Sequence, residues 1–186
     1  MDIYSDTYYI QRVLRGDIDC FASIVDRYSS RIFTLIYRIV GNREDAEELA
    51  QDTFMTAFSK LDKFEGKSSF STWLYRIAYN LAISATRKPR LQTLSINESV
   101  VTAEDLDVAE VEIDESREMI ELLEVALRRL SADETAMITL FYHDNKSLDE
   151  IAHIMNISLS NAKVKLYRCR QHLMSIISEL QRANNG

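Results

Sequence analysis

The sequence predicts an all-α protein made of two small helical domains joined by an acidic linker. Its 186 residues include only four glycines and one proline, which is too few for a β sandwich or barrel with many tight turns. Hydrophobic residues make up 46% of the chain and recur at helical spacing in two separate stretches. Between these stretches, residues 91–115 carry eight acidic residues and no Lys or Arg. We therefore expect domains at residues 1–90 and 116–186, with the linker at 91–115.

The first half of the N-terminal domain predicts two helices. They cover about residues 6–15 and 17–40, and each is followed by a glycine, Gly16 and Gly41. Glycine is favoured just past the C-terminus of a helix because it adopts a left-handed conformation without strain. The second helix has apolar residues at helical spacing, which predicts that this face packs in the core: Phe21, Ile24, Val25, Tyr28, Ile32, Leu35, Ile36 and Ile39.

Two more helices and a loop complete this domain. The third helix begins near residues 42–45, and a polar loop at residues 62–69 leads to the fourth. The fourth helix runs to about Arg87, because Pro89 disfavours helical backbone in the residue before it. Apolar positions again follow helical spacing: Ala46, Leu49, Ala50, Phe54, Ala57, Phe58 and Leu61 in the third helix, and Phe70, Trp73, Leu74, Ile77, Ala78 and Leu81 in the fourth.

The net charge of −7 would by itself argue against a nucleic-acid partner. Residues 1–90 hold 13 basic and 12 acidic residues, however, and residues 116–186 hold nine of each. The excess acidity therefore lies in the linker, which lacks sustained amphipathic periodicity and repels itself, so we expect it to be extended or disordered. Its carboxylates offer one way to mask a basic surface in the free protein; keeping the linker solvated is the simpler alternative.

No segment predicts membrane insertion. The N-terminus is acidic and lacks the apolar run of a secretory leader, and the most hydrophobic stretch, Ile32–Val40, is too short to span a bilayer and contains Arg38. Cys20 and Cys169 lack metal-ligand spacing and do not suggest a disulfide framework. We expect a cytoplasmic protein with no metal and no cofactor.

The C-terminal domain predicts a helix-turn-helix. A helix at residues 119–130 has Ile120, Leu123, Leu127 and Leu130 on its expected inner face. Capping-box patterns at residues 131–134 and 147–150 then open two further helices. A turn at residues 156–158 precedes a last helix, which begins near Ser160 and runs into the 170s.

The last helix has two different faces. Ala162, Leu166, Cys169, Leu173 and Ile176 form an apolar stripe that should pack inward. The opposite face and its flanks carry Lys163, Val164, Lys165, Tyr167, Arg168 and Arg170, and residues 151–178 contain no acid. Such a face can reach DNA phosphates and base edges in the major groove. An ordinary three-helix bundle with a solvated basic face remains the alternative.

Over nearly its whole length the chain resembles the extracytoplasmic-function (ECF) group of bacterial sigma-70 factors. The segments Phe21–Tyr28, Asp45–Phe54 and Phe64–Asn80 resemble sigma region two, and the residues around Leu148 and Ser160–Arg170 resemble region four. The run Ser71-Thr-Trp-Leu-Tyr-Arg-Ile-Ala is the specific signal. The helix-turn-helix alone is less informative because many repressors share it.

The resemblance implies a role in transcription initiation. In this family the third helix grips a coiled coil of core RNA polymerase, and the fourth helix with its preceding loop melts the promoter −10 element and captures a flipped base. The residues implied for polymerase binding are Asp45, Glu48, Leu49, Gln51, Asp52 and Phe54. Those implied for the −10 element are Lys63, Phe64, Lys67, Ser68, Arg76, Tyr79 and Asn80, while Trp73 fits the core better.

The resemblance also implies −35 recognition by the last helix and, as further partners, promoter DNA and an anti-sigma factor. Lys163, Val164 and Tyr167 match base-contacting positions, and Lys165, Arg168 and Arg170 match backbone contacts. The family usually opens this helix with a Gly-Thr pair, where this chain has Ser160-Asn161. Ser160 is still able to cap the helix.

Two other classes of protein are alternatives to a sigma factor. An enzyme is disfavoured because His143, His153 and His172 are scattered and no nucleophile, phosphate-loop or metal-ligand motif is present. A stand-alone transcriptional regulator remains the alternative. It would bind a duplex operator without polymerase.

Overall fold

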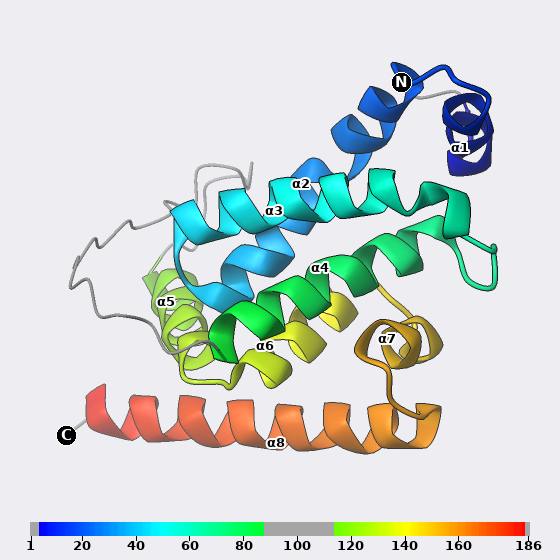
Figure 1. Ribbon diagram of the computed structural model, residues 1–186. Coiled ribbons are helices and arrows are strands. Elements are labelled where there is room, and N and C mark those ends of the chain that lie inside the picture. Colours follow the sequence, from blue (N-terminus) through cyan, green and yellow to red (C-terminus); the bar gives the residue numbers. More distant parts are fainter. Residues whose placement is uncertain (1–3, 88–113, 185–186) are drawn as a thin grey trace.

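A computed structural model describes residues 4–87 and 114–184 of the chain, and all regular secondary structure in these two ranges is helical (Figure 1). The all-α prediction is therefore confirmed for the described part. The expected linker at 91–115 lies almost entirely outside the described residues. Only its last two positions belong to a described helix, which begins at Asp114.

The N-terminal domain contains four α-helices and one short 3-10 turn. These are α1 (Asp6–Leu14), α2 (Cys20–Val40), α3 (Arg43–Ser59), η1 (Leu61–Lys63) and α4 (Phe70–Arg87). Helix α2 begins three residues later than expected. It ends at Gly41, which has the left-handed φ of 70°. Asn42 then caps α3 through a bond from the backbone N–H of Asp45 to its side-chain oxygen, at 2.9 Å.

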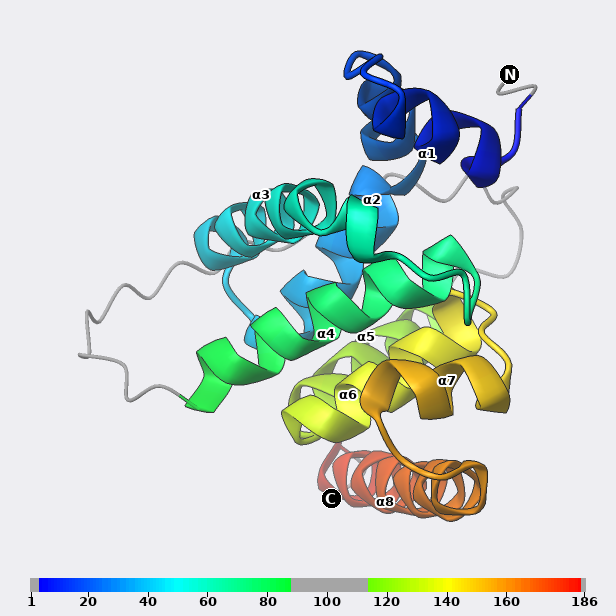
Figure 2. The ribbon, with the colours of Figure 1, turned by 45° about the vertical axis from the view of Figure 1, so that its right-hand side comes forward.

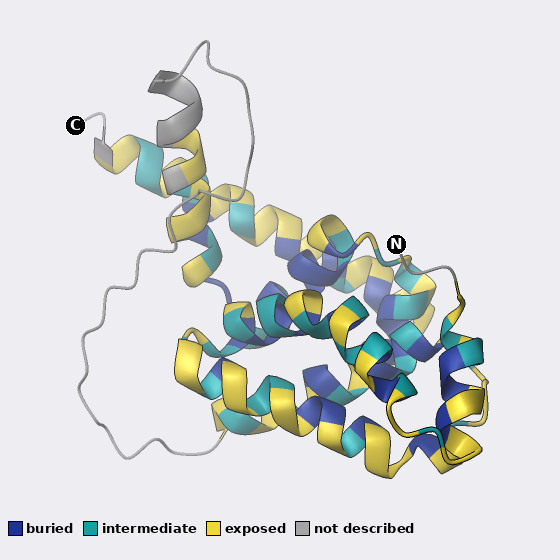
Figure 3. Ribbon diagram, turned by 90° about the horizontal axis from the view of Figure 1, so that it is seen from above, coloured by how far each residue is buried: buried dark blue, intermediate teal, exposed yellow. Residues whose placement is uncertain are grey.

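Helix α2 forms the centre of this domain. Its residues Ile24, Ile32, Leu35 and Ile36 are fully buried, as their helical spacing predicted. Helices α1, α3 and α4 each pack against it. Seen from above, buried positions face inward along these helices and exposed positions face outward (Figure 3).

The C-terminal domain contains α5 (Asp114–Arg128), α6 (Ala132–Ile138), η2 (Thr139–His143), α7 (Leu148–Met155) and α8 (Leu159–Asn184). Both predicted capping boxes are present, with Ser131 and Glu134 opening α6 and Ser147 and Glu150 opening α7. The segment η2 is a π-helical turn, which the sequence pattern did not predict. Helix α8 runs well beyond the 170s, to Asn184.

The prediction for α5 was wrong at two of four positions. Leu130 is buried and Leu127 is half-buried as expected, but Ile120 and Leu123 are 49% and 39% exposed. Helical spacing shows which residues share a face, not how much of that face meets another element. Helix α5 packs on α8. Ala126 in its last turn and Leu130, two residues past its end, belong to the buried core.

The two domains pack directly on each other. In both ribbon views α4 lies between the N-terminal helices and the pair α6 and α7, with α8 beyond them (Figures 1 and 2). Helix α2 also contacts α6 and η2. Buried side chains of both domains form one continuous hydrophobic cluster. We call the contact surface between α2 and α4 on one side and α6, η2 and α7 on the other the seam.

Candidate nucleic-acid interface

The loop before α4 and the first turns of that helix line an open hollow of about 340 Å³. Gly66, with φ of 68°, allows the loop to turn back toward the helix. Among the lining residues are five of the seven predicted −10 residues: Lys63, Phe64, Lys67, Ser68 and Arg76. The structure therefore gathers most of the predicted set around one site.

Two members of an aromatic cluster, Phe64 and Trp73, line this hollow. The ring of Phe64 lies 5.2 Å from Trp73 and 5.6 Å from Phe70, centroid to centroid. Phe70 is buried, whereas Phe64 and Trp73 are half-buried and still contact the core. Trp73 is thus only partly the core residue that was predicted. A partly exposed aromatic surface beside lysine and arginine side chains suits a nucleobase with its phosphate.

The two remaining predicted −10 residues lie in different surroundings. Asn80 is exposed on α4. Tyr79 is only 8% exposed, and its hydroxyl donates to a carboxylate oxygen of Asp133 on α6 at 2.9 Å. Burial, together with this bond, raises the pKa of Tyr79 well above its usual value. In this structure Tyr79 faces the seam and not solvent, because its neighbour is the C-terminal domain.

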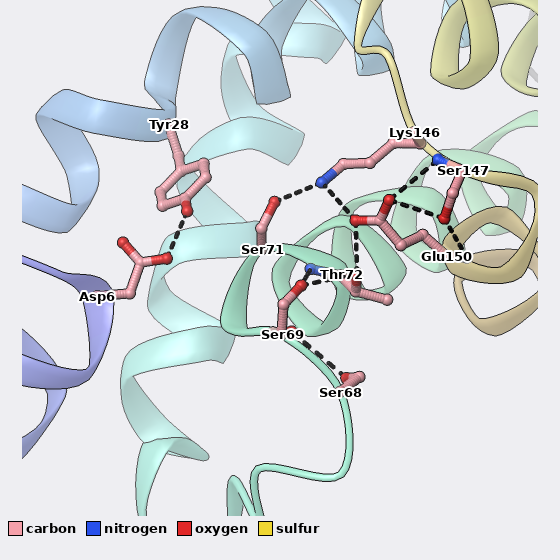
Figure 4. Close-up of polar contacts among 9 residues, drawn as sticks. All are labelled: Asp6, Tyr28, Ser68, Ser69, Ser71, Thr72, Lys146, Ser147 and Glu150. Atoms are coloured by element: carbon pink, nitrogen blue, oxygen red, sulfur yellow. Dashed lines mark hydrogen bonds and ion pairs between the residues drawn. The ribbon is translucent and has the colours of Figure 1, made fainter.

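Polar bonds at the start of α4 tie it to α7 (Figure 4). Ser69 accepts a bond from the backbone N–H of Thr72 at 3.1 Å, which caps the helix. The Thr72 hydroxyl in turn donates to Glu150 at 3.2 Å, and Glu150 is also the capping-box residue of α7. One turn further along α4, Arg76 donates to the side-chain oxygen of Asn156 at 3.3 Å.

Lys146 is a largely buried cation in the same network. Its side chain is 11% exposed, and its ammonium group donates to Ser71 at 2.7 Å and to Glu150 at 3.2 Å. It also lies 4.8 Å from the centre of the Tyr75 ring. Burial by itself would raise the pKa of Glu150, but bonds from the Ser147 N–H and hydroxyl, with the charge of Lys146, lower it below its usual value.

The predicted polymerase-binding residues lie on α3, and most reach solvent. Glu48, Gln51 and Asp52 are exposed, and Asp45 and Leu49 are half-buried. Phe54 is only 8% exposed and belongs to the core. It supports this surface from beneath, because it follows the buried face of the helix and not the acidic one.

The helix-turn-helix consists of α7, a turn and α8. The inward stripe of α8 is as predicted: Ala162, Leu166, Cys169 and Ile176 are buried and Leu173 is half-buried. Ser158 caps α8 by accepting from the backbone N–H of Asn161 at 3.2 Å, so Ser160, the predicted cap, lies inside the first turn. Lys163, Val164, Tyr167 and Arg168 are exposed on the outer face.

Two other cations of α8 are engaged within the domain. Lys165 donates to Asp133 at 3.0 Å. The guanidinium of Arg170 lies 5.3 Å and 5.4 Å from the ring centres of Phe141 and Tyr142. We call α8 the recognition helix. In this conformation two of its cations already have partners within the domain, so fewer of them are unengaged than the sequence indicates.

Within the described ranges, no group of His, Cys, Asp and Glu side chains is arranged to hold a metal ion. None of the helices described there is long and apolar enough to cross a membrane. The geometry defines a two-domain helical protein that presents an aromatic and basic hollow on one domain and a helix-turn-helix on the other.

Comparisons with known proteins identify the family. Residues 24–91 match the model for Sigma-70 region 2, and residues 120–173 match that for Sigma-70, region 4. The chain is 36% identical to the ECF RNA polymerase sigma factor SigW of Bacillus subtilis (strain 168), over 92% of this chain and 96% of the relative. It is 30% identical to the RNA polymerase sigma-H factor of Pseudomonas aeruginosa, over 95% of this chain and 96% of that relative. The chain therefore belongs to the ECF group of sigma-70 factors and is an RNA polymerase sigma factor. This result disfavours the stand-alone regulator.

Two solved structures share the fold. The structure of CnrH in complex with the cytosolic domain of CnrY has a TM-score of 0.69 at 20% identity and covers 94% of this chain and 97% of that one. The sigma factor RpoE of Bartonella quintana, in complex with the anti-sigma factor NepR, has a TM-score of 0.63 at 22% identity. The match covers 85% of this chain and 96% of that one.

Sequence reasoning missed the residues that join the domains. Asp133 and Glu150 were recognised only as capping residues, and Lys146 and His153 were not assigned to any site. His153 lines the hollow from the side of α7. No local pattern signals these contacts, since Thr72 and Glu150 are 78 residues apart and Tyr79 and Asp133 are 54 apart.

Proposed function

We propose that the hollow beside α4 captures an unstacked base of the promoter −10 element. The observation that carries this assignment is the convergence of five predicted residues, from loop and helix, on one aromatic and basic hollow. Phe64 and Trp73 provide a stacking surface, and Lys63, Lys67 and Arg76 provide charge for the phosphates. Aromatic stacking contributes roughly 1–3 kcal/mol per base, which offsets much of the cost of unstacking one base.

The other half of the promoter is assigned to α8. Lys163, Val164 and Tyr167 are exposed near the N-terminal end of this helix, the part that enters the major groove in helix-turn-helix proteins. Lys165, Arg168 and Arg170 are then suited to the phosphate backbone. Residues 1–90 and 116–186 are proposed as the two functional domains.

The exposed acidic and polar side of α3 is proposed as the surface for core polymerase. Glu48, Gln51 and Asp52 offer hydrogen-bond acceptors, and Leu49 adds an apolar contact. Asp45 lies at the N-terminus of the helix, where its charge also favours the helix dipole. Phe54 is proposed to hold this surface in shape from the core.

An anti-sigma factor is proposed as a further partner. Both solved structures described above contain a second protein, and in one of them a sigma factor is bound to a protein that is called an anti-sigma factor. The proposed place of action is the cytoplasm, where bacterial polymerase transcribes, and the proposed role is binding and DNA opening without a chemical reaction of its own.

Transcription from genomic DNA tests the residue assignments. Core polymerase of the source organism is mixed with the wild-type chain, with Asn80→Ala, with Glu48→Ala/Asp52→Ala, or with Ser178→Ala as a matched exposed control on α8. The transcript starts are then sequenced. We expect defined starts with wild type and control, and fewer open complexes with the other two variants.

The readouts separate the two assignments. The Asn80 variant should still bind core polymerase but open promoters poorly, whereas the α3 double variant should lose polymerase binding. Normal initiation by either variant would contradict its assignment. Random or absent starts with wild type would contradict the proposal as a whole.

A further inference from the structure

One stripe of α4 bonds to the C-terminal domain over two turns of the helix. Thr72, Arg76 and Tyr79 lie on this stripe at the spacing that places side chains on one helix face. Their partners are Glu150, Asn156 and Asp133, at 3.2, 3.3 and 2.9 Å. Arg76 and Tyr79 are also residues assigned to the −10 element. The same side chains cannot bind the seam and the DNA at once.

Asp133 connects this stripe to the recognition helix. One of its carboxylate oxygens accepts the hydroxyl of Tyr79 at 2.9 Å, and the other accepts the ammonium of Lys165 at 3.0 Å. The side chain of Lys165 is only 27% exposed as a result. A single carboxylate thus holds one residue assigned to the −10 element and one assigned to the −35 element.

The C-terminal domain also narrows the base-binding hollow. His153 of α7 is one of its lining residues, and Arg76, another lining residue, bonds to Asn156 at the end of the same helix. The docked domain therefore contributes a side chain to the hollow and holds one of the cations that line it.

We propose that Asp133 is a latch that holds the free protein closed and withholds Tyr79 of the −10 surface from DNA. In the closed form the Tyr79 hydroxyl is bound to Asp133 across the seam. Opening the seam breaks this bond and frees Tyr79, whereas the pair of Lys165 with Asp133 lies within the C-terminal domain and is not broken by opening. This inference rests on the proposed function for the identity of the −10 site, but not for the existence of the latch.

The latch predicts by how much the affinity of the free protein for −10 DNA rises when Asp133 is removed. When only the open form binds, the affinity measured for the free protein is lowered in proportion to the open fraction. Removing the Asp133 side chain deletes the hydrogen bond from Tyr79, which only the closed form makes. We expect the open fraction, and with it the affinity for −10 DNA, to rise about three- to tenfold.

The chain offers a matched control for Asp133. Asp133 and Asp149 occupy the same position in two successive capping boxes, two residues after Ser131 and Ser147. Asp149 is exposed and pairs with His153 of its own helix at 3.8 Å. Asp133→Ala and Asp149→Ala therefore remove the same charge from the same helix position, but only the first breaks a bond across the seam.

Two measurements on the full chain test the latch. Single-molecule energy transfer between dyes at Ser59→Cys on α3 and Ser178→Cys on α8 counts closed and open molecules, with Cys20 and Cys169 replaced in every protein. Fluorescence anisotropy measures binding of a short single strand that carries the −10 sequence from the mapped promoters. Tyr79→Phe and Asp133→Asn are added to the dye measurement, so that a poorly folding Asp133→Ala does not decide the result.

The two measurements together separate the latch from its alternatives. A larger open population in Asp133→Ala, with a smaller rise in Tyr79→Phe and none in Asp149→Ala, supports the latch. Open populations equal to the Asp149 control overturn it, and so does tighter DNA binding without opening, which would be a local charge effect. Opening without tighter DNA binding supports the latch and overturns the −10 assignment instead.

Discussion

At the scale of single residues, the seam depends on charges that are bonded and partly buried. The ammonium group of Lys146 is largely shielded from water. It contacts Ser71, Glu150 and the face of the Tyr75 ring instead. An ammonium group in such a place is stable only while its partners are present. Lys146, which lies between η2 and α7, therefore contributes to stability through contacts that include Ser71 and Tyr75 of the other domain.

Lys146→Met tests this role. Methionine keeps an unbranched apolar side chain but removes the charge and leaves Glu150 with fewer donors. We expect the free energy of unfolding, measured by urea titration, to fall by about 1–2 kcal/mol. Lys163→Met, at an exposed site on α8, serves as control and should change it by less than about 0.5 kcal/mol. Equal stability of the two variants would show that the Lys146 contacts contribute nothing.

The two cysteines are predicted to react slowly in the native protein. Burial raises the pKa of the Cys169 thiol to about 11, and the thiol of Cys20, which is half-buried beside Asp17, also has a raised pKa because of burial and the nearby carboxylate. A thiol with a pKa near 11 is ionised in only about one molecule in ten thousand at neutral pH. We expect a thiol-specific dye to label both cysteines quickly in urea and neither quickly in buffer. Fast labelling of native Cys169 would contradict its buried position in α8.

At the scale of helices, the residues where helices begin and end were predictable from the sequence. How the helices pack on one another was less predictable. Gly41, Asn42, Ser131 and Ser147 begin or end helices as the sequence indicates, because capping depends on residues only a few positions apart. The exposure of Ile120 was not predictable, because it depends on how far α5 extends beyond the helix it packs on. The π-helical turn at η2 likewise has no local signal in the sequence.

The cations of the recognition helix predict how the affinity for DNA depends on salt concentration. About three cations meeting phosphates should give a slope near −3 for log K against log salt. Arg168→Ala, on the outer face of α8, should reduce this slope by about one, measured by anisotropy with a −35 duplex. Arg182→Ala, an exposed cation near the C-terminal end of α8, is the control and should leave the slope unchanged. An unchanged slope in Arg168→Ala would place this arginine away from the DNA backbone.

At the scale of the whole molecule, the seam is what the sequence could not predict. The residues that join the domains are 54 to 80 positions apart, and no periodic pattern relates them. The site itself was predictable as a set, because its loop and helix lie close together in sequence and match a specific motif. Which predicted residues reach solvent was not predictable: Tyr79 of the −10 set faces the seam and Phe54 of the polymerase-binding set lies in the core, and both facts depend on tertiary packing.

The carboxylates of the C-terminal domain predict sensitivity to acid. Hydrogen bonds and nearby cations lower the pKa values of Asp133, Glu134 and Glu150 against the opposing effect of burial. Because these folded-state pKa values lie below the ordinary ones, the unfolded chain binds protons first as the pH falls. Their contribution to stability is complete above the ordinary glutamate pKa of 4.5 and is lost as the pH drops through the lower folded-state values.

Glu150→Gln isolates one of these contributions. The variant keeps the size of the side chain but cannot lose a proton, so it should be less stable than wild type at neutral pH by about 1 kcal/mol or less, given the partial exposure of the site. Urea titrations at a series of pH values should show this difference shrinking below pH 4.5. Glu179→Gln, an exposed carboxylate on α8, should follow the wild-type curve throughout. A difference for Glu150→Gln that stays constant into strong acid would mean that its effect comes from altered shape and not from the charge that joins α7 to Lys146 and α4.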